Sequence, residues 1–478
     1  MTDAVQLSAY YALLPEIVLV LGTLALLLAG AVIGEKATGL VTGCAVLLLA
    51  VVAALVIALP AERTVLFGGS FIVDEFARFL KVLTLIGSGA AILMSIEFLG
   101  SPGGRKFEYA LLILLATTGM LMLISAGDLI ALYLGLELMS LSLYVVAAID
   151  RDNARSTEAG LKYFVLGALA SGMLLYGCSL IYGFTGTVSF AGIAGAAGEG
   201  GIGLTVGLVL LFAGLCFKVS AVPFHMWTPD VYEGAPTPIT AFFAAAPKVA
   251  AIAIFVRSAM TAFPAIAGQW QQILAFVAVA SMLLGAFAAI GQVNIKRLMA
   301  YSSIGHMGFA LIGLTAATPE GVQGVLVYIA IYVAMTLGAF ACILAMRRAG
   351  GAVETISDLA GLARTNPSMA FLLAMLLFSL AGVPPLAGFF AKFYVFLAAI
   401  KAGLYTLAVI GVIASVISAY YYLVIVKIMY FDEPAPAFEP MRSELKVVLG
   451  LSGAFNILFF AVPAPLVEAA AVAARSLF

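Results

Sequence analysis

Four ionisable residues lie inside long apolar stretches of this sequence, where a charge is energetically costly. Glu137 occurs near the middle of DLIALYLGLELMSLSLYVVAAI, and Lys218 occurs in LVLLFAGLCFKVSAVP. Lys248 follows a proline in ITAFFAAAPKVAAIAIFV, and Lys392 follows the segment GVPP in PLAGFFAKFYVFLAAI. An ionised side chain at the centre of a membrane helix costs about 2.5–3.5 kcal/mol on insertion scales. Four such residues therefore suggest a function that requires buried charge.

Buried lysine and glutamate are suited to carrying protons. Burial disfavours the charged form of either side chain, so a buried lysine can gain and lose a proton near neutral pH. A neighbouring carboxylate favours the charged lysine again, and its withdrawal releases the proton. We interpret Glu137 and Lys218 as such a pair, and Lys248 and Lys392 as proton carriers, with no cofactor required.

Two structural interpretations compete with this chemistry. A lysine near the end of a span can extend its ammonium to the interface. Four further lysines are explained in this way: Lys81, Lys162, Lys401 and Lys427. Lys248 does not suit this explanation, because about ten apolar residues lie on either side of it. The second interpretation is a static Glu137–Lys218 pair that pins two helices, and a breakable pair would also be a switch.

The two histidines of the chain are further candidates for proton transfer. His306 lies in YSSIGHMGFALIG, inside an apolar stretch, and His225 lies in VPFHMWTPD. Imidazole titrates near neutral pH and can relay a proton. A lone histidine is also often a hydrogen-bonded packing residue, so His306 is a possible relay and His225 a weaker one. Neither has the neighbours that a metal site needs.

The composition places these residues in a membrane protein. Hydrophobic residues make up 64% of the 478-residue chain and charged residues only 10%, against about 25% charged residues in soluble domains. The net charge of −1 gives no electrostatic reason to expect a nucleic-acid partner. The four cysteines lie far apart without a CxxC pair, so a zinc or iron–sulfur site is not expected. No lysine or arginine precedes the first apolar run, so that run is expected to remain as a helix.

Apolar stretches long enough to cross a bilayer recur along the whole chain. A spanning helix needs about 20 mainly apolar residues. We predict an all-α polytopic fold of fourteen spans, near residues 12–33, 39–59, 76–99, 107–126, 128–149, 157–184, 203–221, 238–260, 271–290, 299–316, 321–346, 368–397, 402–430 and 446–466. The glycine-rich segment 191–203 joins two of these spans, so a loop is expected there rather than a phosphate-binding turn.

The positions of lysine and arginine predict the orientation in the membrane, because cytoplasmic loops are enriched in them. With the N-terminus outside, the inward connections carry Lys36, Arg105, Lys106, Arg151, Arg155, Lys296, Arg297, Arg347, Arg348, Arg364, Arg442 and Lys446. The outward connections carry mostly Arg63, Lys401 and Arg475. Both termini are therefore predicted on the periplasmic side of a bacterial inner membrane.

Two of the predicted spans are interrupted beside a buried lysine. Pro223 follows Lys218 in the seventh span, and Pro384 with Pro385 precedes Lys392 in the twelfth. Proline removes a backbone donor and breaks a helix, and the freed carbonyls are tolerated in a membrane only where protein or a cavity meets them. Ion carriers have such breaks at the translocation site.

The two broken helices predict an internal repeat. Spans four to eight and nine to thirteen each form a five-helix unit with the broken helix in fourth place. Five is odd, so the second unit must be inverted relative to the first, as in many transporters. The predicted parts are an N-terminal three-helix segment (1–106), the first repeat (107–260), the inverted second repeat (261–430) and a C-terminal helix (431–478).

The stretch FKVSAVPFHMWTPDVYEGAPTPITAFFAAAPK, residues 217–248, resembles the antiporter-like subunits of respiratory complex I, the proton-pumping NADH:quinone oxidoreductase. The segments NIKRLMAYSSIGHMGF (294–309) and LAGVPPLAGFFAKFY (380–394) agree with this resemblance. WTPDVYEGAP with the later PK is most similar to the N type of these subunits (subunit 2 of the mitochondrial enzyme). The resemblance covers essentially the whole chain, including the fourteen spans.

The resemblance implies roles for the buried residues. Glu137 matches the glutamate of the fifth helix, Lys218 and Lys248 the lysines of the seventh and eighth, and Lys392 the lysine of the broken twelfth. It implies a proton channel in a redox-driven pump, with other membrane-arm subunits as partners, among them another antiporter-like subunit and the small membrane subunits next to the quinone site. NADH, FMN, iron–sulfur clusters and quinone are then bound by other subunits, and no redox chemistry is expected in this chain.

Two alternative functions remain at this point. A subunit of a multisubunit sodium/proton antiporter would use similar buried charges without a redox partner. A scaffold of the membrane arm would hold its neighbours and conduct nothing.

Overall fold

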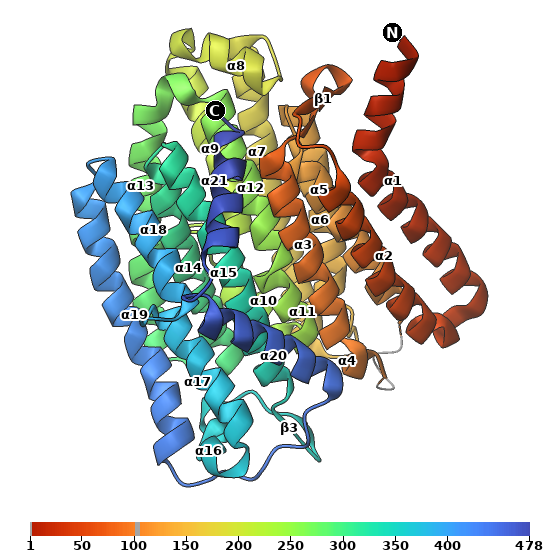
Figure 1. The fold of residues 1–478 in the computed structure, drawn as a ribbon, viewed down its shortest axis with the longest axis vertical. Helices are drawn as coiled ribbons and strands as arrows, with labels where there is room; N and C mark the ends of the chain where they lie inside the picture. Colours follow the sequence, from red (N-terminus) through yellow and green to blue (C-terminus); the bar gives the residue numbers. More distant parts are fainter. Residues whose placement is uncertain (1, 101–105) are drawn as a thin grey trace. The chain divides into compact units, whose positions relative to one another are not determined.

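The computed structural model describes the backbone of residues 2–100 and 106–478, and the side chains of residues 11–100, 106–198 and 200–478. Over these ranges the protein is built almost wholly of helices (Figure 1). Two small antiparallel pairs of strands accompany them: β1 (Thr64–Leu66) with β2 (Phe71–Val73), and β3 (Arg347–Arg348) with β4 (Gly351–Ala352). Arg105, one of the charges predicted to face inward, lies outside the described residues. The predicted all-α polytopic fold is confirmed.

The chain divides into two compact units. The first comprises the described residues up to Val219, together with Ala246–Trp270 and Ala469–Phe478. Its helices are α1 (Thr2–Ile33), α2 (Thr38–Ala58), α3 (Glu75–Met94), α4 (Ile96–Gly100), α5 (Glu108–Ile124), α6 (Leu129–Ala147), α7 (Ala154–Thr185), α8 (Phe190–Ala196), α9 (Gly201–Val219) and α12 (Ala246–Ala262). Most of α21 (Ala464–Arg475) also belongs to it.

The second unit comprises Ser220–Ala245 and Gln271–Glu468. Its helices are α10 (Trp227–Gly234), α11 (Thr237–Ala244), most of α13 (Ala267–Ile290), α14 (Ile295–Thr315), α15 (Pro319–Leu344), α16 (Leu362–Thr365), α17 (Pro367–Ala381), α18 (Ala387–Lys401), α19 (Tyr405–Phe431) and α20 (Ser443–Leu458). The four-part division predicted from the sequence follows the proposed repeats and not these two compact units, and it stays a prediction.

Polar residues at the helix starts explain several boundaries. The side chains of Asp74 and Asp128 accept hydrogen bonds from backbone N–H groups in the first turns of α3 and α6. Asn294 caps α14, and Thr318 caps α15 with Pro319 directly inside the helix. These caps satisfy N–H groups that have no partner within the helix, and proline is well tolerated at the first helical position.

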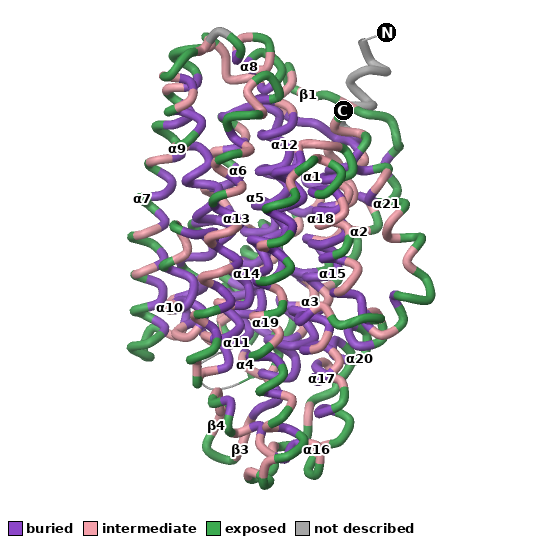
Figure 2. The backbone as a smooth tube through the Cα atoms, turned by 90° about the vertical axis from the view of Figure 1, so that its left-hand side faces the viewer, coloured by how far each residue is buried: buried purple, intermediate pink, exposed green. Residues whose placement is uncertain are grey.

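Burial varies strongly between helices, as Figure 2 shows. In α12, α14 and α15 nearly every residue is buried. By contrast, α1, α2, α7 and α19 expose large apolar side chains such as Leu28, Leu169 and Val416. In a bilayer these exposed faces meet lipid rather than water, so they are compatible with a membrane-embedded protein. The described residues contain ten helical stretches long and apolar enough to cross a membrane, the first holding both α1 and α2, and two shorter apolar helices.

The predicted breaks in the seventh and twelfth spans are present, after α9 and after α17 respectively. α9 ends at Val219, and residues 220–226 separate it from α10, with a cis peptide bond before Pro223. α17 ends at Ala381, and residues 382–386 separate it from α18. Gly382 caps α17 with a φ of 92°, a conformation that glycine adopts without a steric penalty.

Two further interruptions differ from the predicted spans. The stretch predicted at 238–260 is divided at Ala245 into α11 and α12, because this residue has non-helical backbone angles (φ −107°, ψ −93°). The stretch predicted at 446–466 ends as a helix at Leu458, and α21 begins at Ala464. Both breaks lie just before a proline, Pro247 and Pro463, which disfavours helix in the preceding residue. Continuous hydrophobicity nevertheless predicts one span in each place, because it marks a segment as buried but does not report its backbone angles.

Candidate functional site

Lys218 lies in the last turn of α9 and is 6% exposed. Its Nζ donates hydrogen bonds to Ser140 Oγ at 2.7 Å and to Tyr144 Oη at 3.1 Å. The same Nζ lies 5.3 Å from the centre of the Tyr144 ring, within the range of a cation–π contact. The ammonium thus rests on neutral acceptors that α6 provides.

Glu137 shares a face of α6 with these acceptors, because Ser140 and Tyr144 follow it by three and seven residues. The carboxylate is close enough to act electrostatically on Lys218. Within the described side chains, however, no ion pair within 4 Å joins the two, and Glu137 Oε1 is buried without a hydrogen-bond partner. The structure therefore brings the predicted pair to one face and holds it apart.

Lys248 is 1% exposed and lies three residues into α12. Its Nζ donates a hydrogen bond to the backbone oxygen of Val219 at 2.9 Å. Val219 ends α9, so its carbonyl lacks the usual partner four residues further along the helix. The negative end of the helix dipole adds a favourable interaction with a cation. The break after α9, the seventh predicted span, thus creates the acceptor that Lys248 uses.

Lys392 repeats this arrangement in the second unit. Its Nζ donates to the oxygen of Ala381, the last residue of α17, and to Ser415 Oγ, both at 2.8 Å. The side chain is 5% exposed, and the ammonium lies 4.7 Å from the centre of the Phe309 ring. A buried lysine again meets a carbonyl that a helix break has freed.

His306 is part of a buried network of hydrogen bonds in the second unit. Its Nδ1 lies 2.6 Å from Tyr328 Oη and its Nε2 lies 3.2 Å from Tyr422 Oη. Tyr422 Oη in turn hydrogen-bonds Ser302. Hydroxyl and imidazole groups both donate and accept, so such a chain is chemically able to pass a proton.

His225 lies in the segment 220–226, outside the network around His306. It is about half-buried, and its Nδ1 is buried without a hydrogen-bond partner among the described residues. Its backbone oxygen accepts a hydrogen bond from Thr228 at 2.9 Å. This geometry leaves His225 a weaker candidate than His306.

The interpretation of Lys81 as a snorkelling residue is wrong. Lys81 is 1% exposed, and its Nζ forms an ion pair of 2.6 Å with Glu16 of α1. A carboxylate on a helix that packs in the same unit provides the partner, so the ammonium has no need to reach the interface. For the other three lysines of that group the interpretation stays a prediction. Lys162 is partly exposed and pairs with Glu158, Lys427 is exposed and pairs with Asp432, and Lys401 is exposed.

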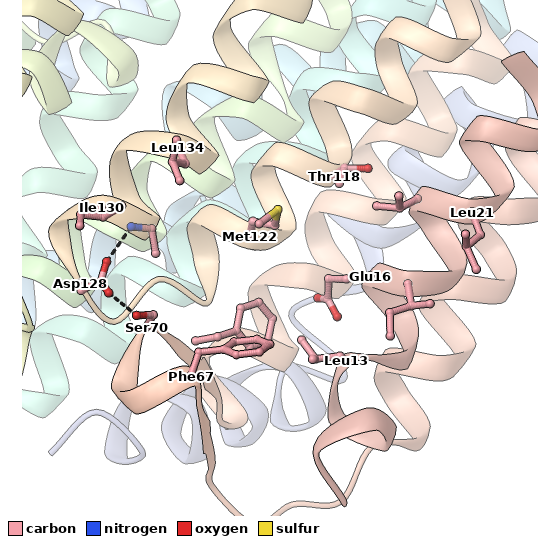
Figure 3. A pocket seen from close by; sticks show the side chains of 14 residues that line it. Leu13, Glu16, Leu21, Phe67, Ser70, Thr118, Met122, Asp128, Ile130 and Leu134 are labelled. Atoms are coloured by element: carbon pink, nitrogen blue, oxygen red, sulfur yellow. Dashed lines mark hydrogen bonds between the residues drawn. The ribbon is translucent and has the colours of Figure 1, made fainter. Parts of the chain in front are cut away.

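Glu16 also lines a groove in the first unit with a volume of about 550 Å³ (Figure 3). Its walls are mainly apolar side chains of α1, α5 and α6. At its edge Asp128 accepts hydrogen bonds from Ser70 and from the N–H of Ala131. This hydrogen bonding joins the segment before β2 to the start of α6.

A second buried ion pair was also missed in the sequence. Arg257 of α12 is 1% exposed and donates two hydrogen bonds of 2.8 Å to the carboxylate of Asp74. Its Nε donates to the oxygen of Ile124 at 3.1 Å. Burial by itself raises the pKa of Asp74, but the charge and hydrogen bonds of Arg257 outweigh this and hold the pKa below its usual value. The sequence does not indicate this pair, because Asp74 and Arg257 are 183 residues apart in the chain.

Two of the charges predicted to face inward, Lys296 and Arg297, form ion pairs within the second unit. Lys296 is 3% exposed and pairs with Glu354 at 2.6 Å. Arg297 bridges Asp230 and Glu233 of α10 at 2.7 and 3.0 Å. These residues tie the start of α14 to α10 and to the segment that follows β4.

Interrupted helices whose free ends meet ionisable groups inside an all-α membrane fold are typical of ion-coupled transporters. The family described as NADH:quinone oxidoreductase/Mrp antiporter, TM, matches residues 126–418. Among solved structures, a chain of respiratory complex I from Thermus thermophilus is similar over 95% of this chain and 98% of its own length, with 33% identity and a TM-score of 0.83. A chain of the Mrp complex from Dietzia shares the fold, with 23% identity, a TM-score of 0.82 and coverage of 98% and 97%.

The curated relatives are more specific. NADH-quinone oxidoreductase subunit N of Azorhizobium caulinodans is 67% identical over 98% of both chains. The subunit N of Parvibaculum lavamentivorans is 62% identical over 97% of both. The chain belongs to the NADH-quinone oxidoreductase subunit N family. The family resemblance of the sequence is thereby confirmed.

Proposed function

We propose that this chain conducts protons across the bacterial inner membrane as an antiporter-like subunit of NADH-quinone oxidoreductase, and that Lys248 is its central carrier. The observation that carries the proposal is the buried Lys248 ammonium on the free carbonyl of Val219, 2.9 Å away. A neutral carbonyl accepts a hydrogen bond from either protonation state of a lysine. It therefore suits a group whose charge must change.

The Glu137–Lys218 pair supplies the switch in this proposal. When Lys218 lies against Glu137, the carboxylate neutralises it, and Lys248 can hold a proton nearby. When Lys218 lies against Ser140 and Tyr144, as it does here, its positive charge is less compensated. Like charges in a low-dielectric interior repel, so this second arrangement favours loss of the proton from Lys248.

The proton then passes to Lys392 and leaves on the outward side. His306 is proposed as the relay, because its two ring nitrogens join Tyr328 and Tyr422 in one hydrogen-bonded network. Lys392 lies close enough to act electrostatically on His306. His225 has a lesser role in proton entry, near the inward end of the seventh span.

The energy source lies outside this chain in this proposal. NADH, FMN, iron–sulfur clusters and quinone belong to other subunits. The signal reaches Glu137 electrostatically from a neighbouring membrane-arm subunit, either another antiporter-like subunit or a small subunit next to the quinone site. Both termini face the periplasm.

The test compares Lys248→Met with Lys162→Met in the assembled complex in inverted membrane vesicles. Lys162 is the matched control, because its side chain is partly exposed and forms an ion pair with Glu158 one turn away. We expect Lys248→Met to lower the number of protons translocated per NADH oxidised, and Lys218→Ala and Glu137→Ala to lower it as well. Unchanged stoichiometry and turnover in all three variants, with normal assembly, would mean that the chain is a scaffold.

The same vesicles discriminate against a sodium/proton antiporter. Proton movement should depend on NADH oxidation and should be indifferent to a sodium gradient. Sodium-driven proton movement without NADH would contradict the proposal.

A further inference from the structure

Helix α3 holds α12, the helix of Lys248, at one end through a buried charge pair. The carboxylate of Asp74, at the start of α3, receives both terminal nitrogens of Arg257 at 2.8 Å. Arg257 also lies 5.0 Å from the centre of the buried Phe76 ring. Bidentate pairs of this kind fix orientation as well as distance. The pair therefore fixes the height and the rotation of α12 relative to α3 at Arg257.

The same two helices meet at the opposite end of the contact through close packing. A Cβ atom on Gly87 of α3 would lie 3.2 Å from the Cβ, 3.3 Å from the N and 3.4 Å from the Cα of Ala246. Ala246 is the first residue of α12 and directly follows the break at Ala245. Backbone atoms thus lie against the glycine, with no flexible side chain between them.

These two contacts are far enough apart to determine how α12 is oriented. Ala246 and Arg257 are eleven residues apart, which is about 17 Å along a helix. Lys248 follows Ala246 by two residues, so the Gly87 contact fixes the end of α12 that carries the ammonium. Ser88, next to Gly87, also receives a hydrogen bond of 2.8 Å from Thr117 of α5, which anchors α3 at the same height.

We propose that Gly87, together with the Asp74–Arg257 pair, positions Lys248 for proton transfer. This gives the N-terminal three-helix segment, which holds none of the proton-carrying residues, a part in the reaction. The inference rests on the proposed role of Lys248. In chemical terms, α3 keeps the start of α12 in place so that the Lys248 ammonium meets the Val219 carbonyl, and a displaced α12 lengthens that 2.9 Å hydrogen bond.

The experiment compares Gly87→Val with Gly89→Val in the assembled complex. Gly89 is the matched control, because it lies in the same helix and a Cβ there meets nothing within 4 Å. We expect Gly87→Val to lower the protons translocated per NADH oxidised and to shift the pH at which translocation is half-maximal. Gly89→Val should change neither, and blue native gels should show equal amounts of assembled complex.

A double-mutant cycle separates positioning from general damage. If Gly87 acts through Lys248, adding Gly87→Val to Lys248→Met should cause no further loss of translocation, because coupled residues are non-additive. Additive losses, or an unchanged pH profile in Gly87→Val, would overturn the positioning role. A Lys248→Met variant that pumps normally would instead refute the proposed function, so the two failures are distinguishable.

A smaller substitution covers the case in which Gly87→Val prevents assembly. Gly87→Ala adds one methyl group, and Ala246 must then move by only a few tenths of an ångström. The same cycle with Gly87→Ala should show a smaller pH shift in the same direction. An assembled Gly87→Ala complex with wild-type translocation and pH profile would contradict the proposal.

Discussion

The hydrogen bond between Lys218 and Ser140 provides the sharpest test of the proposed switch. Ser140→Ala removes an acceptor that lies 2.7 Å from the ammonium and leaves Glu137 untouched. Lys218 should then spend more time against Glu137, because the arrangement on Ser140 and Tyr144 has lost one of its two hydrogen-bond acceptors. The remaining partner, Tyr144 Oη, is the longer contact at 3.1 Å.

The expected magnitude follows from the charge of the donor. A hydrogen bond to a charged group contributes about 1.5–3 kcal/mol to stability. At 25 °C this corresponds to a shift of about 10- to 150-fold in the equilibrium between the two arrangements. The pair must separate in every cycle, so we expect NADH-driven proton translocation in coupled vesicles to slow by about tenfold or more. Adding Tyr144→Phe, which keeps the ring, should slow it further.

Ser142→Ala is the matched control for this test. Ser142 lies on the same helix and is also buried, but its hydroxyl bonds the backbone oxygen of Leu138 at 3.0 Å. Its removal should leave translocation close to the wild-type rate. Equal rates in Ser140→Ala and Ser142→Ala, at equal levels of assembled complex, would refute the view that Lys218 moves between Ser140 and Glu137.

Two further predictions concern the buried charges. Lys81→Met leaves Glu16 buried without its partner and should destabilise the detergent-solubilised complex by about 3–5 kcal/mol. The double variant Glu16→Leu/Lys81→Met should recover most of that loss. Thermal inactivation of both variants measures the effect, and a double variant as unstable as the single one would contradict the prediction. Gly382→Ala places a Cβ 3.0 Å from the Cδ and 3.2 Å from the Nζ of Lys392 in a left-handed backbone conformation, and it should reduce translocation. Gly403→Ala is the control for backbone strain alone, because Gly403 has a similar φ of 77° and a Cβ there meets nothing within 4 Å. An equal loss of translocation in both variants would exclude a specific effect on Lys392.

The sequence predicts the main elements because hydrophobicity and proline are local signals. Apolar length marks the spans, and Pro223 and Pro384 mark the breaks in the seventh and twelfth helices. The break at Ala245 carries a weaker mark: Pro247 follows two residues later and disfavours helix just before it, but the alanines at 244–246 favour helix. A local propensity is only a weak preference where packing competes with it.

The candidate site is predictable in part for a related reason. Lys218, Lys248 and Lys392 stand out because each interrupts an apolar run. Their acceptors do not, because Ser140 and the carbonyls of Val219 and Ala381 are unremarkable in sequence. Whether Lys218 touches Glu137 or lies apart from it is a matter of a side-chain conformation, which no pattern of residues encodes.

The acceptors themselves distinguish two kinds of buried cation in this protein. Lys81 and Arg257 meet carboxylates, and removing either charge would leave a buried anion without a partner. Such a cation is held in one charge state, so it is fit for joining helices. Lys248 and Lys392 donate instead to helix-end carbonyls.

A carbonyl at the end of a broken helix places a different demand on its partner. It needs a donor, because its own helix provides none, and a neutral amine still has N–H groups to donate. The partial negative charge there favours the ammonium by only about 0.3–1 kcal/mol, or up to about 2 kcal/mol when partly buried. This is far less than the cost of separating a buried ion pair. A helix break therefore stabilises a buried lysine without fixing its charge, which is the property that a proton carrier requires.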